Sequence, residues 1–212
     1  MQPLRPMPLD SVIALHAQLF HALNPDVVAG GSVPLVIGVA RFASEVLPPV
    51  LIGALFAALV LAPNHVRRRI LLVLASMALA WLAARAIQVL WPQPRPFALD
   101  VGEAWLAHAH SPSLPSMHAT VAAVFALSLS MSFGWRMAVV TVPLAGLIAW
   151  SRICLGLHFP VDVLAGLLVG TVATLWTHAC FSAPRVRWMG RVMRRRLRLR
   201  VSRGGGRLAS GL

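Results

Sequence analysis

Three separate segments of the chain carry side chains that bind phosphate or transfer it. Arginine guanidinium groups match the oxygens of phosphate with two parallel hydrogen bonds. A histidine oriented by a carboxylate can act as a nucleophile, and a second histidine can protonate the leaving oxygen. These residue types together predict a site for phosphoryl transfer. The candidate residues are Arg95, Ser116, His118, Arg152, His158 and Asp162.

Spacing within the last two segments assigns a task to each group. Asp162 follows His158 by four residues, just past Pro160, so its carboxylate can reach back to one nitrogen of that imidazole. Such a contact would fix the tautomer and leave the other nitrogen as the nucleophile. Ser116 stands at the start of an apolar helix, where free backbone N–H groups and the hydroxyl form an anion-binding terminus. His118 is then free to act as the general acid.

No carboxylate cluster suited to Mg²⁺ accompanies these residues in the sequence. We therefore expect a site with no metal and no other cofactor, in which Arg95 and Arg152 supply the charge stabilisation usually given by metal. Two further polar residues, Ser151 and Glu45, are candidate accessory residues. Glu45 also follows Arg41 by four residues, and an ion pair within one helix is the first interpretation of that spacing.

The elements that must position these groups are apolar helices. The chain has 212 residues, of which 58% are hydrophobic and 12% are charged, and its mean hydropathy is +0.76. Soluble domains carry about 25% charged residues, so this composition excludes a water-soluble globule and a disordered chain. Five stretches are long enough to cross about 30 Å of hydrocarbon. They are Val33–Ala62, Ile70–Trp91, Pro115–Phe133, Met137–Leu155 and Pro160–Phe181.

These stretches predict an all-α fold, a polytopic membrane helical bundle with about five transmembrane helices. An N-terminal interfacial helix is expected within residues 10–24, which are too short and too polar to span a membrane. Pro48 and Pro49 should kink the first span, because each proline removes a backbone donor from its interior.

Arginines are concentrated in connectors that fall on one side of the predicted bundle. They stand at Arg67, Arg68, Arg69 and Arg136, and ten of the 19 arginines follow Pro184. The positive-inside rule makes this side cytoplasmic. The candidate residues come from the opposite ends of the spans, so we expect them to converge at the outer face of the membrane.

The C-terminal tail differs in composition from the rest of the chain. We expect a membrane-embedded domain over residues 1–183 and an Arg-rich, disordered cytoplasmic tail over residues 184–212. A basic tail on an apolar chain indicates anionic lipid headgroups as its partner, in preference to nucleic acid.

Three short motifs resemble the signatures of the type 2 phosphatidic acid phosphatase family. They are RP at 95–96, PSMH at 115–118 and SR-x5-H-x3-D from Ser151 to Asp162, in the family's order and spacing. The resemblance covers about residues 80–175 and implies an antiparallel helical bundle that removes phosphate from lipid phosphates without metal. It implies that His158 is the nucleophile and forms a phosphohistidine, with Asp162 as its partner. It further assigns His118 as the general acid, while the phosphate is held by Arg95, Ser116 and Arg152.

Two positions depart from the family pattern. Gln88 stands where the first signature usually has lysine, and Met117 replaces the usual glycine of the second signature. Gln88 can still donate a hydrogen bond to phosphate but brings no charge, and Arg85, one helical turn earlier, is the alternative that could replace the lysine. Both departures are similar to the bacterial branch of the family that acts on undecaprenyl diphosphate.

The resemblance therefore implies a metal-independent lipid phosphatase of the bacterial cytoplasmic membrane. Its expected reaction is hydrolysis of undecaprenyl diphosphate to undecaprenyl phosphate on the outer face. Other lipid phosphates remain alternatives: phosphatidylglycerophosphate, phosphatidate and lipid A, as does transfer of the phosphoryl group to another lipid. A non-catalytic transporter or membrane anchor is a further alternative, although its polar residues should be spread through the depth of the bilayer.

Overall fold

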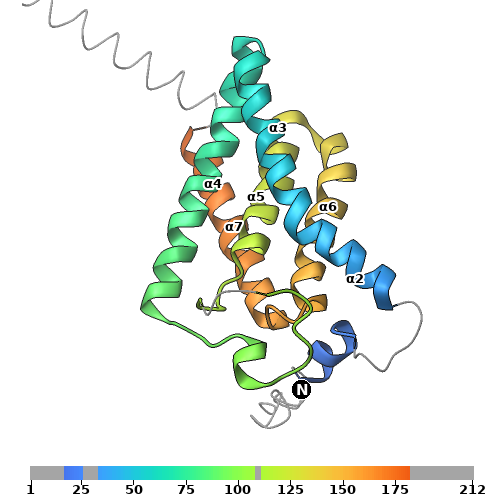
Figure 1. The fold of residues 1–212 in the computed structure, drawn as a ribbon. Coiled ribbons are helices and arrows are strands. Elements are labelled where there is room, and N and C mark those ends of the chain that lie inside the picture. Colours follow the sequence, from blue (N-terminus) through green and yellow to red (C-terminus); the bar gives the residue numbers. More distant parts are fainter. Residues whose placement is uncertain (1–16, 26–32, 108–110, 182–212) are drawn as a thin grey trace, which may run out of the picture.

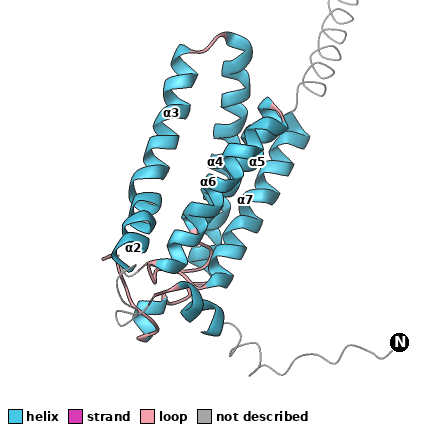
Figure 2. Cartoon of the chain, turned by 90° about the vertical axis from the view of Figure 1, so that its right-hand side faces the viewer, coloured by secondary structure: helices cyan, strands magenta, loops and turns pink. Residues whose placement is uncertain are grey.

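The computed structural model describes residues 17–25, 33–107 and 111–181. Within them the chain forms helices joined by turns and loops, and no strand occurs (Figures 1 and 2). The all-α prediction is confirmed. The elements after the N-terminal segment are α2 (Val33–Arg41), the π-helical turn η2 (Phe42–Val46), α3 (Leu47–Leu61), α4 (Asn64–Leu90), the 3₁₀ turn η3 (Pro96–Leu99), α5 (Met117–Phe133), α6 (Trp135–Cys154) and α7 (Pro160–Phe181).

Among the described residues, four helical stretches are long and apolar enough to cross a membrane. They are Val33–Leu61, which joins α2, η2 and α3, and the helices α4, α6 and α7. The fifth expected span, α5, has 17 residues, of which nine are buried, and it packs against α4, α6 and α7. A helix surrounded by others in this way lies at the centre of the bundle, so the fold is the polytopic membrane bundle that the sequence predicts.

Two glycines bring α7 into contact with α5. A Cβ atom on Gly166 would lie 2.5 Å from the Ser116 carbonyl oxygen, and one on Gly170 would meet the carbonyl oxygen of Thr120. Small residues four apart allow this close approach of two membrane helices. The Ser116 N–H also donates to the Asp162 carbonyl at 2.9 Å, so the first turns of the two helices are fixed side by side.

An irregular turn interrupts the first span just before the two prolines. The Leu47 N–H donates to the Phe42 carbonyl, five residues earlier, and η2 therefore has the wider winding of a π-helix. Pro48 and Pro49 lack N–H groups for the carbonyls four residues before them, which accounts for a break at this place. Ser44 lies in the turn and is buried.

The arginines expected in connectors lie in the first turns of α4 and α6, at the end of the bundle opposite the candidate residues (Figure 1). At one end the guanidinium of Arg69, near the start of α4, stacks over the ring of Phe133 at the end of α5, 5.6 Å from its centroid. At the other end lie the long connector after α4 and the turn between α6 and α7. The Arg-rich tail lies outside the described residues, and the assignment of the first end to the cytoplasm stays a prediction.

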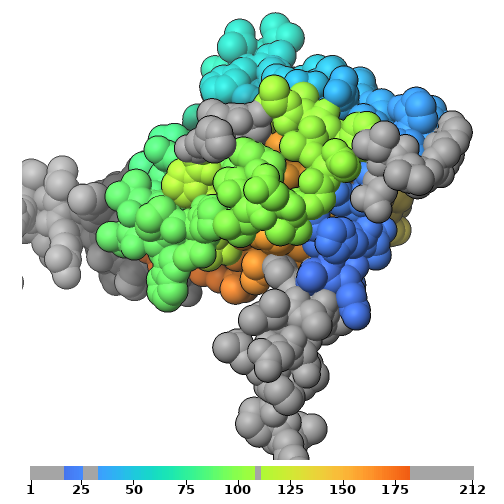
Figure 3. Space-filling view, turned by 60° about the horizontal axis from the view of Figure 1, so that its bottom comes forward, coloured from blue at the N-terminus to red at the C-terminus, as the bar shows by residue number. Residues whose placement is uncertain are grey.

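An N-terminal segment covers the end that carries the candidate residues. Residues 17–23 are helical, and Phe20 is fully buried with its ring 5.4 Å from that of Phe159. The Asn24 side chain donates to the carbonyls of Glu103 and Cys154, at 3.0 and 2.9 Å. In Figure 3 this segment (blue) lies beside the connector after α4 (green) on the same face. The first part of the predicted interfacial helix lies outside the described residues.

Candidate active site

The turn that carries His158 is shaped by the way α6 ends. Gly156 has a φ of +71°, a conformation that glycine adopts at little cost, and a Cβ there would meet the Glu103 carbonyl. This reversal lets the N–H groups of Leu157 and His158 both donate to the Arg152 carbonyl, at 3.1 and 3.2 Å. His158 is thereby held against the end of α6, with only 2% of its surface exposed.

A serine hydroxyl lies between His158 and Asp162. Nδ1 of His158 is 3.6 Å from Oδ2 of Asp162, which is too long for a hydrogen bond. Ser113 Oγ is 3.2 Å from Nδ1 and donates a short hydrogen bond to Asp162 Oδ2. The spacing of the sequence brings the imidazole and the carboxylate together, but the direct hydrogen bond that we expected is replaced by a link through Ser113.

This network assigns the tautomer of His158. Because the hydroxyl of Ser113 donates its proton to Asp162, it can only accept from Nδ1, which must then carry a hydrogen. Nε2 consequently holds the lone pair. It lies 3.0 Å from Nη1 of Arg95, a group that can only donate. Nε2, the nitrogen expected to act as the nucleophile, is therefore unprotonated in this arrangement.

Burial and charge keep this imidazole neutral. Desolvation lowers the pKa of His158 to about 4, and the positive charges of Arg95 and Arg152 act in the same direction. The interaction with Asp162 raises the pKa but does not offset the other two effects. A neutral imidazole at pH 7 is the form that can attack phosphorus.

Arg95 uses all five of its N–H donors on the protein. Nε and Nη2 donate to the backbone and side chain of Ser111 at 2.8 and 3.1 Å, and Nη2 also reaches the Pro112 carbonyl at 3.4 Å. Nη1 donates to the Leu157 carbonyl at 2.9 Å and to His158. Burial lowers the pKa of Arg95, although the charge of Asp162 partly offsets this. Arg95 thus ties the connector to the turn, and its bond to His158 is the one that an incoming phosphate could replace.

Arg152 and Ser116 keep polar atoms without partners. Arg152 is 2% exposed, and Nη1 donates to Ser44 Oγ in η2, but Nε and Nη2 have no hydrogen bond. The hydroxyl of Ser116, at the N-terminus of α5, is buried and equally unpartnered. Buried donors without acceptors are costly, and they are the expected place for the oxygens of an anion. The carboxylate of Glu45 lies near enough to interact with the charge of Arg152.

Two neighbouring residues, Arg41 and Ser151, make contacts that the sequence did not predict. Arg41 does not pair with Glu45, because its Nη2 donates to the Trp105 carbonyl at 2.6 Å. Ser151 donates to the Ile148 carbonyl of its own helix at 2.7 Å.

Gln88 is buried two residues before the end of α4 at Leu90. Its Nε2 donates to the Pro115 carbonyl at 3.0 Å, and its Oε1 accepts from Arg85 Nη1 at 2.9 Å. Gln88 therefore links α4 to the residue just before Ser116.

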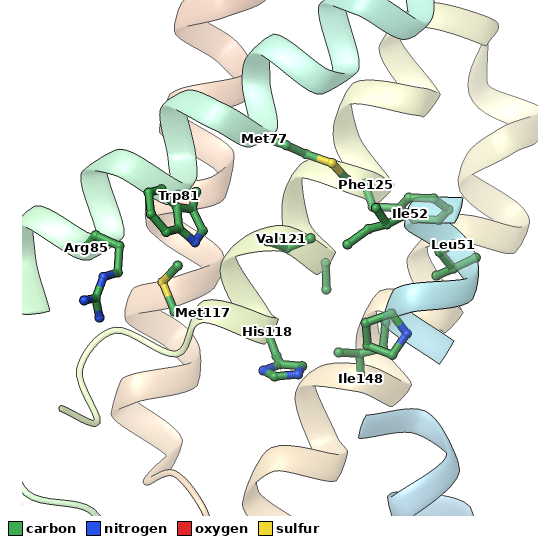
Figure 4. A pocket seen from close by; sticks show the side chains of 12 residues that line it. Leu51, Ile52, Met77, Trp81, Arg85, Met117, His118, Val121, Phe125 and Ile148 are labelled. Atoms are coloured by element: carbon green, nitrogen blue, oxygen red, sulfur yellow. The ribbon is translucent and has the colours of Figure 1, made fainter. Parts of the chain in front are cut away.

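His118 lies in the first turn of α5 and lines a cavity of about 470 Å³ between α3, α4, α5 and α6 (Figure 4). The lining is mostly apolar, and Figure 4 shows the imidazole close to Ile148 of α6 and on the same side of α5 as Val121 and Phe125. The cavity thus joins the first turn of α5 to the apolar interior of the bundle.

Comparison with known proteins assigns the family. The model of the PAP2 superfamily matches residues 69–185, more than half of the chain. The chain belongs to the PAP2 superfamily. It is 34% identical over 193 residues to the Escherichia coli strain K12 protein YbjG, named as a candidate undecaprenyl-diphosphatase, with 80% of this chain and 94% of the relative covered. It is 35% identical over 91 residues to the undecaprenyl-diphosphatase BcrC of Bacillus subtilis strain 168, covering 41% of this chain and 44% of that one.

Two crystal structures share the fold. Aquifex aeolicus LpxE has a TM-score of 0.62 and 24% identity, covering 77% of this chain and 94% of that one. The PAP2-type phosphatidylglycerolphosphate phosphatase of Bacillus subtilis has a TM-score of 0.59 and 20% identity, covering 80% and 86%. The protein is therefore a multi-pass membrane phosphatase of the PAP2 superfamily.

Among the residues that the structure describes, no group of three or more His, Cys, Asp or Glu could hold a metal ion. The expectation of a metal-free reaction stays a prediction. Sequence reasoning missed Ser113 and Ser44, which contact His158, Asp162 and Arg152. Ser113 belongs to the same polar segment as Ser116, SPSLPSMH, and that shared segment is the one signal that pointed to it.

Proposed function

We propose that this PAP2 protein hydrolyses undecaprenyl diphosphate to undecaprenyl phosphate and inorganic phosphate through a phosphohistidine. The observation that carries the proposal is the buried, neutral His158, whose Nε2 lies beside Arg95. Unpartnered donors of Arg152 and Ser116 and an apolar cavity accompany it in the same bundle. The names of the two relatives, one a candidate undecaprenyl-diphosphatase and the other an undecaprenyl-diphosphatase, support the choice of lipid.

In the first step Nε2 of His158 attacks the terminal phosphorus, and the bond from that phosphorus to the bridging oxygen breaks. His118 donates a proton to the bridging oxygen, which leaves as part of undecaprenyl phosphate. Asp162 acts through Ser113 to hold the hydrogen on Nδ1 and to stabilise the positive charge that forms on the imidazole. Arg152 and the hydroxyl of Ser116 at the N-terminus of α5 bind the phosphate oxygens.

In the second step water attacks the phosphohistidine. The phosphorus–nitrogen bond breaks, inorganic phosphate leaves, and the lone pair returns to Nε2 of His158. His118, which lost its proton in the first step, now takes one from the water. No metal or cofactor is assigned a part, because the two arginines already balance the charge of the transferred group.

The proposal also sets the orientation in the membrane. The site lies at the end of the bundle opposite the arginines in the first turns of α4 and α6, and the positive-inside rule places those arginines in the cytoplasm. We place the site at the outer face of the bacterial cytoplasmic membrane. Residues 1–183 form the membrane domain, and the tail 184–212 lies inside, where its arginines attract anionic lipids.

A panel of lipid phosphates tests the substrate. Purified protein in detergent with excess EDTA is given undecaprenyl diphosphate, phosphatidylglycerophosphate or phosphatidate, and phosphate release is measured, with His158→Ala as the blank. We expect turnover to persist in EDTA and kcat/KM to be highest for the diphosphate. Faster cleavage of phosphatidylglycerophosphate, the substrate named for the Bacillus subtilis structure, would contradict the assigned lipid and leave the chemistry standing.

A further inference from the structure

The cavity beside the site contains an arginine that the mechanism does not use. The cavity is lined by twelve residues, and the basic ones are Arg85 of α4 and His118 of α5 (Figure 4). Arg85 stands five residues before the end of α4 at Leu90, about 7 Å along the helix axis. An exposed arginine at this depth is costly unless it has an anionic partner, so its presence points to a function.

Hydrogen bonds connect this guanidinium, through Gln88, to Pro115 just before α5. Arg85 Nη1 donates to Gln88 Oε1 at 2.9 Å, and Gln88 Nε2 donates to the Pro115 carbonyl at 3.0 Å. Pro115 directly precedes Ser116, whose hydroxyl has no partner. In Figure 4 the guanidinium points toward the level of Met117 and His118, along the direction of the outer end of α4.

A neutral residue at position 88 makes this arrangement possible. A lysine there would place a second positive charge against Arg85 and would offer it no acceptor. The Gln88 amide instead accepts from Arg85 with one end and donates to the Pro115 carbonyl with the other. The departure of this chain from the family pattern at residue 88 is therefore matched by a positively charged group at residue 85.

The chemistry of the leaving group explains what this charge could bind. In the proposed reaction His118 stands between the transferred phosphate and the leaving group, whose apolar tail must lie in the bilayer or the cavity. When the substrate is a diphosphate, the leaving group is a lipid monophosphate that carries negative charge. When the substrate is phosphatidate, the leaving group is a neutral diacylglycerol, and a cation in the cavity gains nothing.

We propose that Arg85 binds the lipid-side phosphate of a diphosphate, so that the mouth of the cavity is a second phosphate subsite that selects diphosphates over monophosphates. This inference rests on the proposed function and extends it. Arg152 and Ser116 bind the phosphate that is transferred, and Arg85 binds the phosphate that leaves with the lipid. Gln88 is then a positioning residue for Arg85 rather than a ligand of the transferred phosphate.

Two measurements on Arg85→Gln separate this subsite from the first one. The first is kcat/KM for undecaprenyl diphosphate, and the second is the inhibition constant of inorganic phosphate, which reports the transferred-phosphate site alone. We expect kcat/KM to fall about tenfold or more, because one charged pair with the substrate is lost. The inhibition constant of inorganic phosphate should change by less than about twofold, because Arg85 does not contact the transferred phosphate in this proposal. Arg85→Lys keeps the charge and should recover most of the loss. Arg136→Gln, which removes an exposed arginine at the other end of the bundle, is the matched control and should leave both values unchanged.

Three results would overturn the subsite. An equal loss in both measurements would mean that Arg85 only holds Pro115 and Ser116 in place through Gln88. No change in either would make it an anchor to the headgroups of bulk lipid. A variant that keeps its preference for undecaprenyl diphosphate over phosphatidate would deny it a part in selectivity. A wild-type protein that cleaves phosphatidate and not the diphosphate would reject the proposed function first, and this result is recognisable before any variant is made.

Discussion

Ser113 connects the imidazole of His158 to the carboxylate of Asp162. Its hydroxyl contacts both Nδ1 of His158 and Oδ2 of Asp162, and its own N–H is fixed by the Gln93 carbonyl at 2.8 Å. The 3.6 Å separation between imidazole and carboxylate is bridged by this one side chain. Ser113 is thus a positioning residue, and its removal should lower the rate of the chemical step.

Ser113→Ala should lower kcat by about tenfold to a hundredfold, because one hydrogen bond to a charged group contributes about 1.5–3 kcal/mol. KM should change little, since Ser113 has no contact with the donors assigned to phosphate. Steady-state phosphate release on the purified variant measures both constants. Ser132→Ala, which removes an unpartnered hydroxyl in the last turns of α5, is the matched control. Wild-type kcat in Ser113→Ala would show that Asp162 orients the imidazole without the serine.

At the residue scale the sequence predicted the chemical groups better than their contacts. The residue types and the four-residue step from His158 to Asp162 indicated a nucleophile and its partner, and the structure brings the two together. The contact of Ser113 could not be predicted, because it depends on how a loop folds back over the turn between two helices. The same holds for Ser44 against Arg152, which are 108 residues apart.

Among the elements, the contact between α5 and α7 matters most for the site. α5 presents the unpartnered Ser116 hydroxyl and α7 presents Asp162, and the Ser116 N–H bonds directly to the Asp162 carbonyl. Gly166 allows this approach, since a Cβ there would lie 2.5 Å from the Ser116 carbonyl. The glycine therefore sets the distance between the two halves of the site.

Gly166→Ala should destabilise the bundle by about 1–3 kcal/mol and lower activity, because the two helices must move apart to admit a methyl group. Thermal unfolding in detergent and phosphate release measure the two effects. Gly146→Ala is the control, since a Cβ on Gly146 meets nothing within 4 Å and alanine is the better helix former. Equal stability of the two variants would contradict this account of the helix contact.

Hydropathy predicted the spans because membrane helices must be apolar over about 20 residues. It did not predict that α5 would be the shortest of the five, since a helix enclosed by others is subject to packing rather than to the thickness of the lipid. The two prolines indicated a break in the first span, but not its π-helical form or the hydrogen bond that Ser44 accepts there from Arg152.

For the whole molecule, the main feature is the distance between the basic residues and the candidate active-site residues. The arginines in the first turns of α4 and α6 lie at one end of the bundle and the candidate residues at the other (Figure 1). This arrangement fits a lipid phosphatase that works on the outer leaflet and is held in orientation by cytoplasmic charge.

Cysteine labelling in intact cells checks the orientation. In a background with Cys154→Ala and Cys180→Ala, an impermeant thiol reagent should label Ala104→Cys in the long connector, where the side chain is exposed. Asn64→Cys, exposed at the start of α4, should react only after the cells are permeabilised. The reverse pattern would place the site in the cytoplasm.

The central claim is that His158 carries the phosphoryl group, and trapping that intermediate tests it most directly. Purified protein is mixed with undecaprenyl diphosphate labelled with ³²P on the terminal phosphate, quenched in alkali within one turnover, and digested. We predict acid-labile label on the peptide that contains His158, and none on His158→Ala, which should also have lost turnover. Label on a different residue, or wild-type turnover by His158→Ala, would contradict the claim.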